Sequence, residues 1–256
     1  MKFPIQWGRV PVPYTTLWSS EDETDFEVRL LKLDGVKRPF LCHTVDSPGV
    51  GRPHLGKSHT SRQVEVVRER LCQCCHQPLP RPAWAFTYGL QHDRKPVVTD
   101  GHPMCEPCAL LALASCPALR ARQASGMLRV WLTTGWSPMP SVLGIIEAQD
   151  PIAQKVNAVL AKNLHRHPFI HGGVRLRLED FRLVPPAAIA AAMGAAQEAE
   201  DARRADLGTG GAGEGAVGGA DLPTPGIAAG PVGAGAAGDG GGKSAVTESI
   251  SDHTLW

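Results

Sequence analysis

The spacing of apolar and polar residues along the chain predicts a mixed α and β fold. From Phe26 to Cys42 the pattern is that of a β-hairpin, because apolar and polar residues alternate in the first arm and Asp34-Gly35 favours a two-residue turn. Pro39 lies in the second arm. Since proline cannot donate a ladder hydrogen bond, this arm is expected at the edge of a sheet.

Further strands and helices follow from the same periodicities. Alternation predicts a strand over Pro82–Gly89 with Lys95–Thr99 as its partner, and separate strands over Met127–Thr134, Ser141–Ala148 and Val174–Val184. Helical periodicity or alanine-rich composition predicts helices over Ser61–Leu71, Cys108–Ser115, Ile152–Leu164 and Pro185–Asp206. Thr60 and Gln63 have the spacing of a capping box, and residues 46–57, with three glycines and two prolines, predict a loop. The expected fold class is α+β.

Composition divides the chain into a folded body and a tail. Residues 207–256 hold 15 of the 28 glycines and almost no bulky apolar residue, so they cannot offset the entropy of ordering and are expected to be disordered. Within the body we expect an extended segment and hairpin over 1–60, a metal-binding module with flanking helices over 61–123, and an α+β segment over 124–206. The terminal Trp256 is either a docking residue or a chance occurrence.

Four of the seven cysteines fall into two C-x-x-C pairs, Cys72 with Cys75 and Cys105 with Cys108, separated by 29 residues. Two thiolates two residues apart can be presented by one tight turn, and two such turns form the four-sulfur tetrahedron of structural zinc sites. The second pair stands at the start of a predicted helix, which gives the knuckle, hairpin, knuckle and helix order of a small treble clef. The pattern predicts one structural Zn²⁺ per chain, with these four cysteines as ligands.

Other residues near the pairs compete for the ligand positions. Cys74 would replace Cys75 in a C-x-C pair, and His76 or His102 would substitute for a thiol that is not bound. Cys116 lies two helical turns after the second pair, about 12 Å along a regular helix, which is too far to share the ion. A redox pair or two unligated pairs are the remaining interpretations, although no thioredoxin-like βαβ pattern accompanies them.

Targeting signals are not visible in the sequence. No apolar stretch follows Lys2, so no signal peptide is expected, and the longest weakly apolar stretch, Pro185–Ala196, is shorter than the about 20 residues of a transmembrane helix. In a chain without an export signal, this cysteine pattern favours metal binding over disulfides. We therefore expect a cytoplasmic protein without membrane association, whose oligomeric state the sequence leaves open.

Charge indicates nucleic acid, DNA or RNA, as one class of partner. The tail carries five acids and one base, so the first 206 residues carry 25 bases and 20 acids, a net charge of +5. Five bases before the first cysteine pair form the predicted nucleic-acid-binding set: Arg52, Lys57, Arg62, Arg68 and Arg70. A solvated helix face is the alternative interpretation of the last three.

Four stretches within about residues 1–122 are distinctive: GRVPVPYTTLWSSEDE at 8–23, GRPHLGKSHTSRQ at 51–63, LCQCCHQPL at 71–79 and PMCEPCALLALASCPALR at 103–120. Together they resemble a group of uncharacterised actinobacterial and phage-associated proteins with a W-G-x-V-P-Y opening and a small zinc-finger module. The resemblance implies metal-ligand roles for the four cysteines of the two pairs and a structural role for Cys116-Pro117. The chain departs from the group by Cys74 and by His76, where the group tends to have glycine.

These observations predict a zinc-stabilised, non-enzymatic protein that acts as a nucleic-acid-binding accessory factor. The first alternative is a protein–protein interaction adaptor with a structural zinc. The second is a metal-dependent nuclease of the His-Asn-His kind, with His92 as general base, but the helix after Cys108 has no His or Asn to hold a catalytic cation. The His-rich stretch Asn163–His171 is interpreted as a weak second metal or phosphate site.

Overall fold

The computed structural model describes residues 4–8, 10–21, 24–88, 97–99, 101–143 and 151–209, and it has the mixed α+β fold that the sequence predicts. The described elements through residue 198 belong to one compact unit, and the last helix continues from Ala199 into a second. The predicted disordered tail beyond Thr209 and the predicted turn at residues 90–94 lie outside the described residues.

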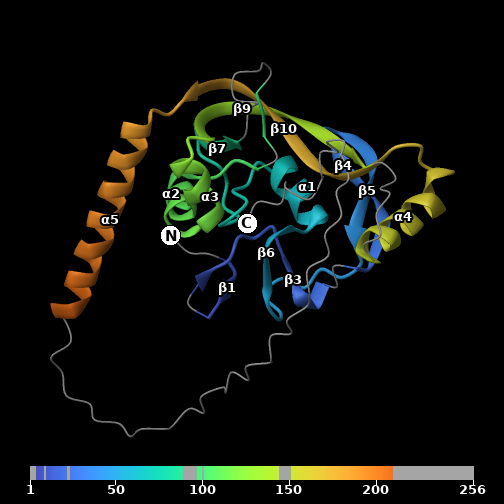
Figure 1. Cartoon of the computed structure of the whole chain (residues 1–256), viewed down its shortest axis with the longest axis horizontal. Helices are drawn as coiled ribbons and strands as arrows, with labels where there is room; N and C mark the ends of the chain where they lie inside the picture. Colours follow the sequence, from blue (N-terminus) through green and yellow to red (C-terminus); the bar gives the residue numbers. More distant parts are fainter. Residues whose placement is uncertain are drawn as a thin grey trace, which may run out of the picture. The chain divides into compact units, whose positions relative to one another are not determined.

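A mixed sheet forms the centre of the first unit. Its main path runs β4–β5–β10–β9–β7, and β8 joins at β10 (Figure 1). β5 and β10 are parallel, and the other pairings along the sheet are antiparallel. All three predicted segments of the body contribute strands to this sheet: β4 (Phe26–Leu33), β5 (Val36–His43), β7 (Ala83–Tyr88), β8 (Val98–Thr99), β9 (Leu128–Leu143) and β10 (Ile170–Leu183).

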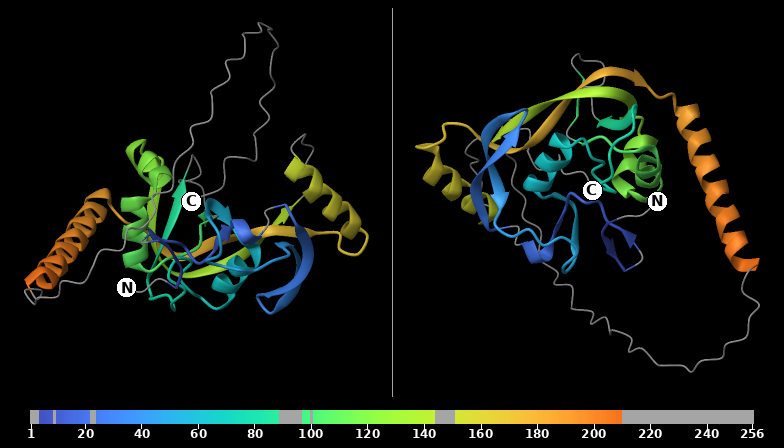
Figure 2. Two further views of the ribbon diagram at one scale, coloured as in Figure 1. Left: turned by 90° about the horizontal axis from the view of Figure 1, so that it is seen from below. Right: turned by 180° about the vertical axis from the view of Figure 1, so that it is seen from behind.

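The described part of the chain contains five α-helices: α1 (Thr60–Arg68), α2 (Glu106–Ser115), α3 (Pro117–Ala124), α4 (Pro151–Leu164) and α5 (Pro186–Thr209). Four of them lie where the sequence predicts a helix, and α3 is an additional helix after Cys116. The predicted capping box does not form, because α1 begins at Thr60 and its N-cap is His59, which makes no side-chain cap hydrogen bond. α1 packs against β4, β5 and β10, whereas α4 packs against β4 (Figure 2).

β4 and β5 form the predicted hairpin around Asp34-Gly35, whose φ angles are 51° and 77°. Positive φ at both positions is what a type I′ turn requires, which explains the Asp-Gly pair. The prediction that the arm with Pro39 lies at a sheet edge is wrong, because β10 pairs with the other side of β5. That pairing has a single register pair, Phe40 with His171. Pro39 is tolerated there because so short a pairing does not require a hydrogen bond from the amide that proline lacks.

β9 is one continuous strand of 16 residues, although its prolines predicted a break between two strands. β7 pairs with β9 only from Leu128 to Thr133, while Pro138 and Pro140 pair with β10. The second half of β9 has no partner on its other side among the described strands. Proline is tolerated at such an edge because no ladder hydrogen bond is lost there.

Among the described residues, the two arms of the hairpin predicted between the cysteine pairs do not pair with each other. β7 pairs with β9, and β8 pairs with β10, so the two predicted partners join different strands of the sheet. β7 still presents two different faces, as strand alternation requires. Trp84 and Phe86 pack with residues of α2 and α3, whereas Ala83 and Ala85 lie in the core that includes Val64 of α1.

The N-terminal segment forms two small sheets. β1 (Gln6–Trp7) pairs with β2 (Val10–Pro11), and β3 (Thr16–Trp18) pairs with β6 (Pro53–Ser58). A short 3₁₀ helix follows β3 at Ser19–Glu21. The loop predicted over residues 46–57 is therefore replaced by a strand from Pro53 onward. A register shift in β3, between Thr16 and Leu17, makes the pairing irregular and accommodates the glycine and proline content of β6.

Candidate metal centre

The four predicted ligands, Cys72, Cys75, Cys105 and Cys108, meet at one point, with their sulfur atoms within 4.8 Å of one another. The Sγ atoms of Cys75 and Cys105 are 3.7 Å apart. A tetrahedral ion with bonds of about 2.3 Å to sulfur places its ligand atoms about 3.8 Å apart, whereas a disulfide bond is about 2.05 Å long. All seven cysteines are free thiols, and the spacing of these four could hold a metal ion.

Cys72 and Cys75 lie in a tight turn that backbone hydrogen bonds close. The amide of Cys72 donates to the carbonyl of Gln77 at 2.8 Å, and the amide of His76 donates to the carbonyl of Cys72 at 2.9 Å. His76 has a φ of 56°, which lies in the left-handed region. Glycine adopts this region without steric cost, and histidine is among the other residues that are found there more often than average. This left-handed conformation explains why the turn can hold histidine at position 76, where the proteins that the chain resembles tend to have glycine.

The side chain of His76 is held by the N-terminal segment and α1. Its ring stacks on Tyr14 with centroids 3.9 Å apart, and its Nε2 lies 3.2 Å from Oε1 of Glu65. The Tyr14 hydroxyl donates to Oε2 of the same carboxylate at 2.8 Å, and burial together with this bond raises the pKa of Tyr14 above its usual range. His76 therefore positions the first turn and has partners other than a metal ion.

The second pair stands at the start of α2. Cys105 is the N-cap residue, and Cys108 follows in the first helical turn. Met104 and Trp84 exchange backbone hydrogen bonds of 2.8 and 2.9 Å, which fix this turn to β7. The positive end of the helix dipole points toward the sulfurs and stabilises thiolates.

Four thiols at this distance perturb one another strongly. Hydrogen bonds from the Cys105 and Cys108 thiols hold the pKa of Cys72 far below its usual range, because they stabilise a thiolate. Hydrogen bonding to Cys108 and to Cys72 raises the pKa of Cys105 in turn. A bound divalent cation would replace the shared protons and stabilise all four sulfurs as thiolates.

The residues that compete for the ligand positions lie outside the four-thiol group. Cys74 is buried, and its thiol donates to the sulfur of Met104 at 3.4 Å. His102 is also buried, which lowers its pKa to about 4, and the backbone of Val174 hydrogen-bonds its ring. Cys116 is buried at the junction of α2 and α3.

A second cluster of metal-ligand residue types, Glu21, Asp46 and His59, lies beside the buried guanidinium of Arg62. Glu21 is fully buried, and its carboxylate accepts hydrogen bonds from Arg62 Nη2 at 2.7 Å and from the amides of Trp18 and Ser47. Arg62 Nη1 lies 3.4 Å from Asp46. Because Arg62 already supplies positive charge here, we assign this cluster a structural role.

Burial of Arg62 corrects the predicted nucleic-acid-binding set, since a guanidinium that is 1% exposed and paired with Glu21 cannot contact a phosphate. The other four members are exposed. Arg68 pairs with Glu69 at 2.7 Å, and the Arg70 guanidinium lies 4.6 Å from the centroid of the Trp136 ring. The predicted nuclease base, His92, lies outside the described residues.

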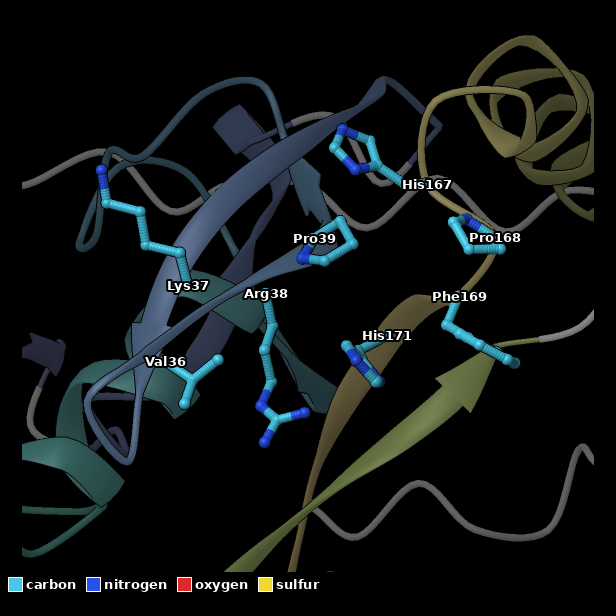
Figure 3. Close-up of a pocket in the computed structure, with 8 residues that line it drawn as sticks. All are labelled: Val36, Lys37, Arg38, Pro39, His167, Pro168, Phe169 and His171. Carbon is cyan, nitrogen blue, oxygen red and sulfur yellow. The ribbon is translucent and has the colours of Figure 1, made fainter.

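A pocket lies where β5 meets the segment before β10 (Figure 3), and the sequence indicated only one of its two sides. The His-rich stretch Asn163–His171, which the sequence indicated as a weak metal or phosphate site, supplies one side of the pocket. The other side comes from β5, which the sequence predicted only as an arm of a hairpin. The single parallel pair that joins them, Phe40 with His171, leaves no local signal in the sequence.

Comparison of the chain with known protein families, with curated proteins and with solved structures gives no match. Within the described residues, no helix is both long and apolar enough to cross a membrane. The assignment of function therefore rests on the residues and their geometry.

Proposed function

We propose that the four-thiol group binds one structural Zn²⁺ and that the protein is a non-enzymatic, nucleic-acid-binding accessory factor. The meeting of four Sγ atoms from two turns that are 29 residues apart in the sequence supports the metal. Four protein thiolates complete a tetrahedral shell and leave no position for water or substrate, which favours a structural ion over a catalytic one. Iron also accepts four thiolates, so the test must identify the element.

Nucleic-acid binding is supported by the charge of the segment from α4 into β10. Residues 151–178 contain five bases and three histidines and no acid. All five bases are exposed: Lys155, Lys162, Arg166, Arg175 and Arg177. Such a run is an electrostatic footprint for a phosphate backbone, and it is more strongly basic than the set predicted near α1.

The finer features of the prediction belong to the same proposal. The zinc module has the treble-clef order of a first cysteine turn, strands, a second cysteine turn and a helix, although its two strands, β7 and β8, pair with different strands of the central sheet. The protein is cytoplasmic and of the actinobacterial or phage type that its first 122 residues resemble.

Two measurements test the proposal. Elemental analysis of protein purified without chelator should give about one zinc and no stoichiometric iron per chain. A labelled oligonucleotide should bind in fluorescence anisotropy and weaken steeply between low and physiological salt, because binding releases counterions. Absence of zinc would remove the first half of the proposal.

The same assay separates the alternatives. Absence of oligonucleotide binding at low salt would favour the protein–protein adaptor. Cleavage that depends on a divalent ion and disappears in His92→Ala would favour the nuclease.

A further inference from the structure

A pocket of about 240 Å³ lies between the β4–β5 hairpin and the segment that leads from α4 into β10 (Figure 3). Its lining includes Lys37 and Arg38 from β5 and His167, Phe169 and His171 from the second segment. None of the eight described residues that line it is acidic. The chemistry of the lining therefore favours an anion.

Two of the residues that line this pocket each have a buried polar atom without a hydrogen-bond partner among the described residues. The first is Nδ1 of His171, a residue that is 7% exposed and whose ring the backbone of Ser141 hydrogen-bonds. The second is Nε of Arg38. Burial lowers the pKa of His171, and the positive charge of Arg38 lowers it further.

An anion in the pocket would improve the electrostatics of this lining. Its negative charge would attract the Arg38 guanidinium and offset the repulsion between that guanidinium and a protonated His171 imidazole. The attraction is stronger beside partly buried groups than in open water, because such groups are less screened by solvent.

Arg38 and His171 lie on two paired strands, β5 and β10, next to a buried aliphatic cluster. His171 is paired in register with Phe40, and their rings are 5.3 Å apart. Ile170 and Leu160, both fully buried, lie in the aliphatic cluster of α4, β5 and β10. Side chains placed by paired strands above a packed core are preorganised for a ligand.

Phe169 adds an aromatic surface at the rim of the pocket. It is 64% exposed, the highest value among the exposed large hydrophobic residues of the described chain. Exposed basic residues Arg166 and Lys162 precede it in the sequence. A basic site beside an exposed aromatic ring is the combination by which proteins hold single strands, whose bases stack on the ring.

We propose that this pocket binds a backbone phosphate of a single-stranded nucleic acid, with Arg38 and His171 at the phosphate and Phe169 stacked on a neighbouring base. The inference rests on the proposed nucleic-acid function. It adds where the nucleic acid binds and that the bound nucleic acid is single-stranded. A duplex is the poorer ligand, because its bases are stacked on one another and do not offer a free face.

The test is fluorescence anisotropy with the full-length, zinc-loaded protein and labelled single-stranded DNA, single-stranded RNA and duplex DNA. Phe169→Ala should weaken single-strand binding about 5- to 150-fold, the range for losing one base stack. Arg38→Gln should weaken binding and reduce the slope of log affinity against log salt by about 0.7, the value for one phosphate contact with a single strand.

Matched controls are Arg120→Gln, an exposed arginine on α3, and Met127→Ala, an exposed apolar residue after α3. Both should bind single strands like the wild type. Zinc content and thermal unfolding are measured for every variant. Should Arg38→Gln fail to fold, Phe169→Ala still decides the question, because a side chain that is 64% exposed contributes little to the core.

The outcomes separate the pocket from the wider function. Wild-type affinity in both pocket variants would overturn this inference and leave the proposed function standing, whereas no oligonucleotide binding by the wild type would overturn both. Equal affinity for duplex and single strand would overturn the single-strand assignment. Binding of inorganic phosphate that Arg38→Gln abolishes, in a protein that binds no oligonucleotide, would also overturn the inference in favour of a free phosphate.

Discussion

The four-thiol module and the β5–β10 pocket are built in opposite ways. The module's core contains Cys72, Cys75 and Cys108 among apolar residues of β7, α2 and α3. The core beneath the pocket is aliphatic and is formed by residues such as Leu160 and Ile170. In the first region the proposed metal ligands are themselves part of the core, whereas in the second an aliphatic core lies beneath the residues that line the pocket. The two regions should therefore respond differently to the same kind of perturbation.

The largest expected effect is the loss of one thiol ligand. Cys108→Ser should lose the metal and unfold the module, because structural zinc contributes about 10–16 kcal/mol in small zinc peptides, as much as the whole stability of a typical domain. Near-ultraviolet circular dichroism should report lost packing around Trp84, and elemental analysis should report lost zinc. Cys116→Ser is the matched control, because Cys116 is buried but lies outside the four-thiol group. Zinc retained by Cys108→Ser would contradict the ligand assignment.

This contrast also explains what could be predicted from the sequence. A C-x-x-C pair is a local pattern, since one turn such as Cys72–Cys75 sets both sulfurs, and two such pairs predict a shared ion without any knowledge of the fold. The Asp34-Gly35 turn and the helical stripe of α4 are local for the same reason. Each was recognisable because the residues that decide the structure are neighbours in the sequence.

Strand pairing and burial depend on distant residues and were not predictable in the same way. Nothing local in Pro82–Gly89 indicates that β7 pairs with β9 rather than with β8. Arg62 has the helical position of a solvated base, and its burial is favourable because of partners far away in the sequence, which are Glu21, Asp46 and the carbonyl of Thr16. The pocket has the same origin, because Arg38 and His171 meet through one parallel strand pair.

The buried ion pair gives the second largest effect and does not involve the metal. Arg62→Met should destabilise the protein by about 3–5 kcal/mol, because it leaves the Glu21 carboxylate buried without its counter-charge. Denaturant unfolding measures this loss, and zinc content should stay near one per chain in the folded protein. The double variant Arg62→Met/Glu21→Gln should recover part of the lost stability, since no charge is then buried. A single variant as stable as the wild type would show that the pair is not formed.

A cavity in the aliphatic core tests the metal-independent side of the comparison. Leu160 is fully buried in the cluster beneath the pocket, so Leu160→Ala should cost about 2–5 kcal/mol. Thermal unfolding with and without chelator measures the effect in each state of the metal site. Zinc content should remain that of the wild type, in contrast to Cys108→Ser. Simultaneous loss of zinc would show that the two regions fold as one cooperative unit.

The smallest expected effect concerns Cys74, which separates C-x-x-C from C-x-C ligation. Its thiol donates to Met104 and lies outside the four-thiol group, while Cys75 places its sulfur 3.7 Å from that of Cys105. Cys74→Ser should therefore keep its zinc and lose only about 1–3 kcal/mol, because a hydroxyl is less favourable than a thiol in a buried apolar site. Cys75→Ser is the matched comparison and should lose the ion. If the two variants behaved in the reverse way, the first turn would bind through Cys72 and Cys74, and His76 would no longer sit directly after a ligand.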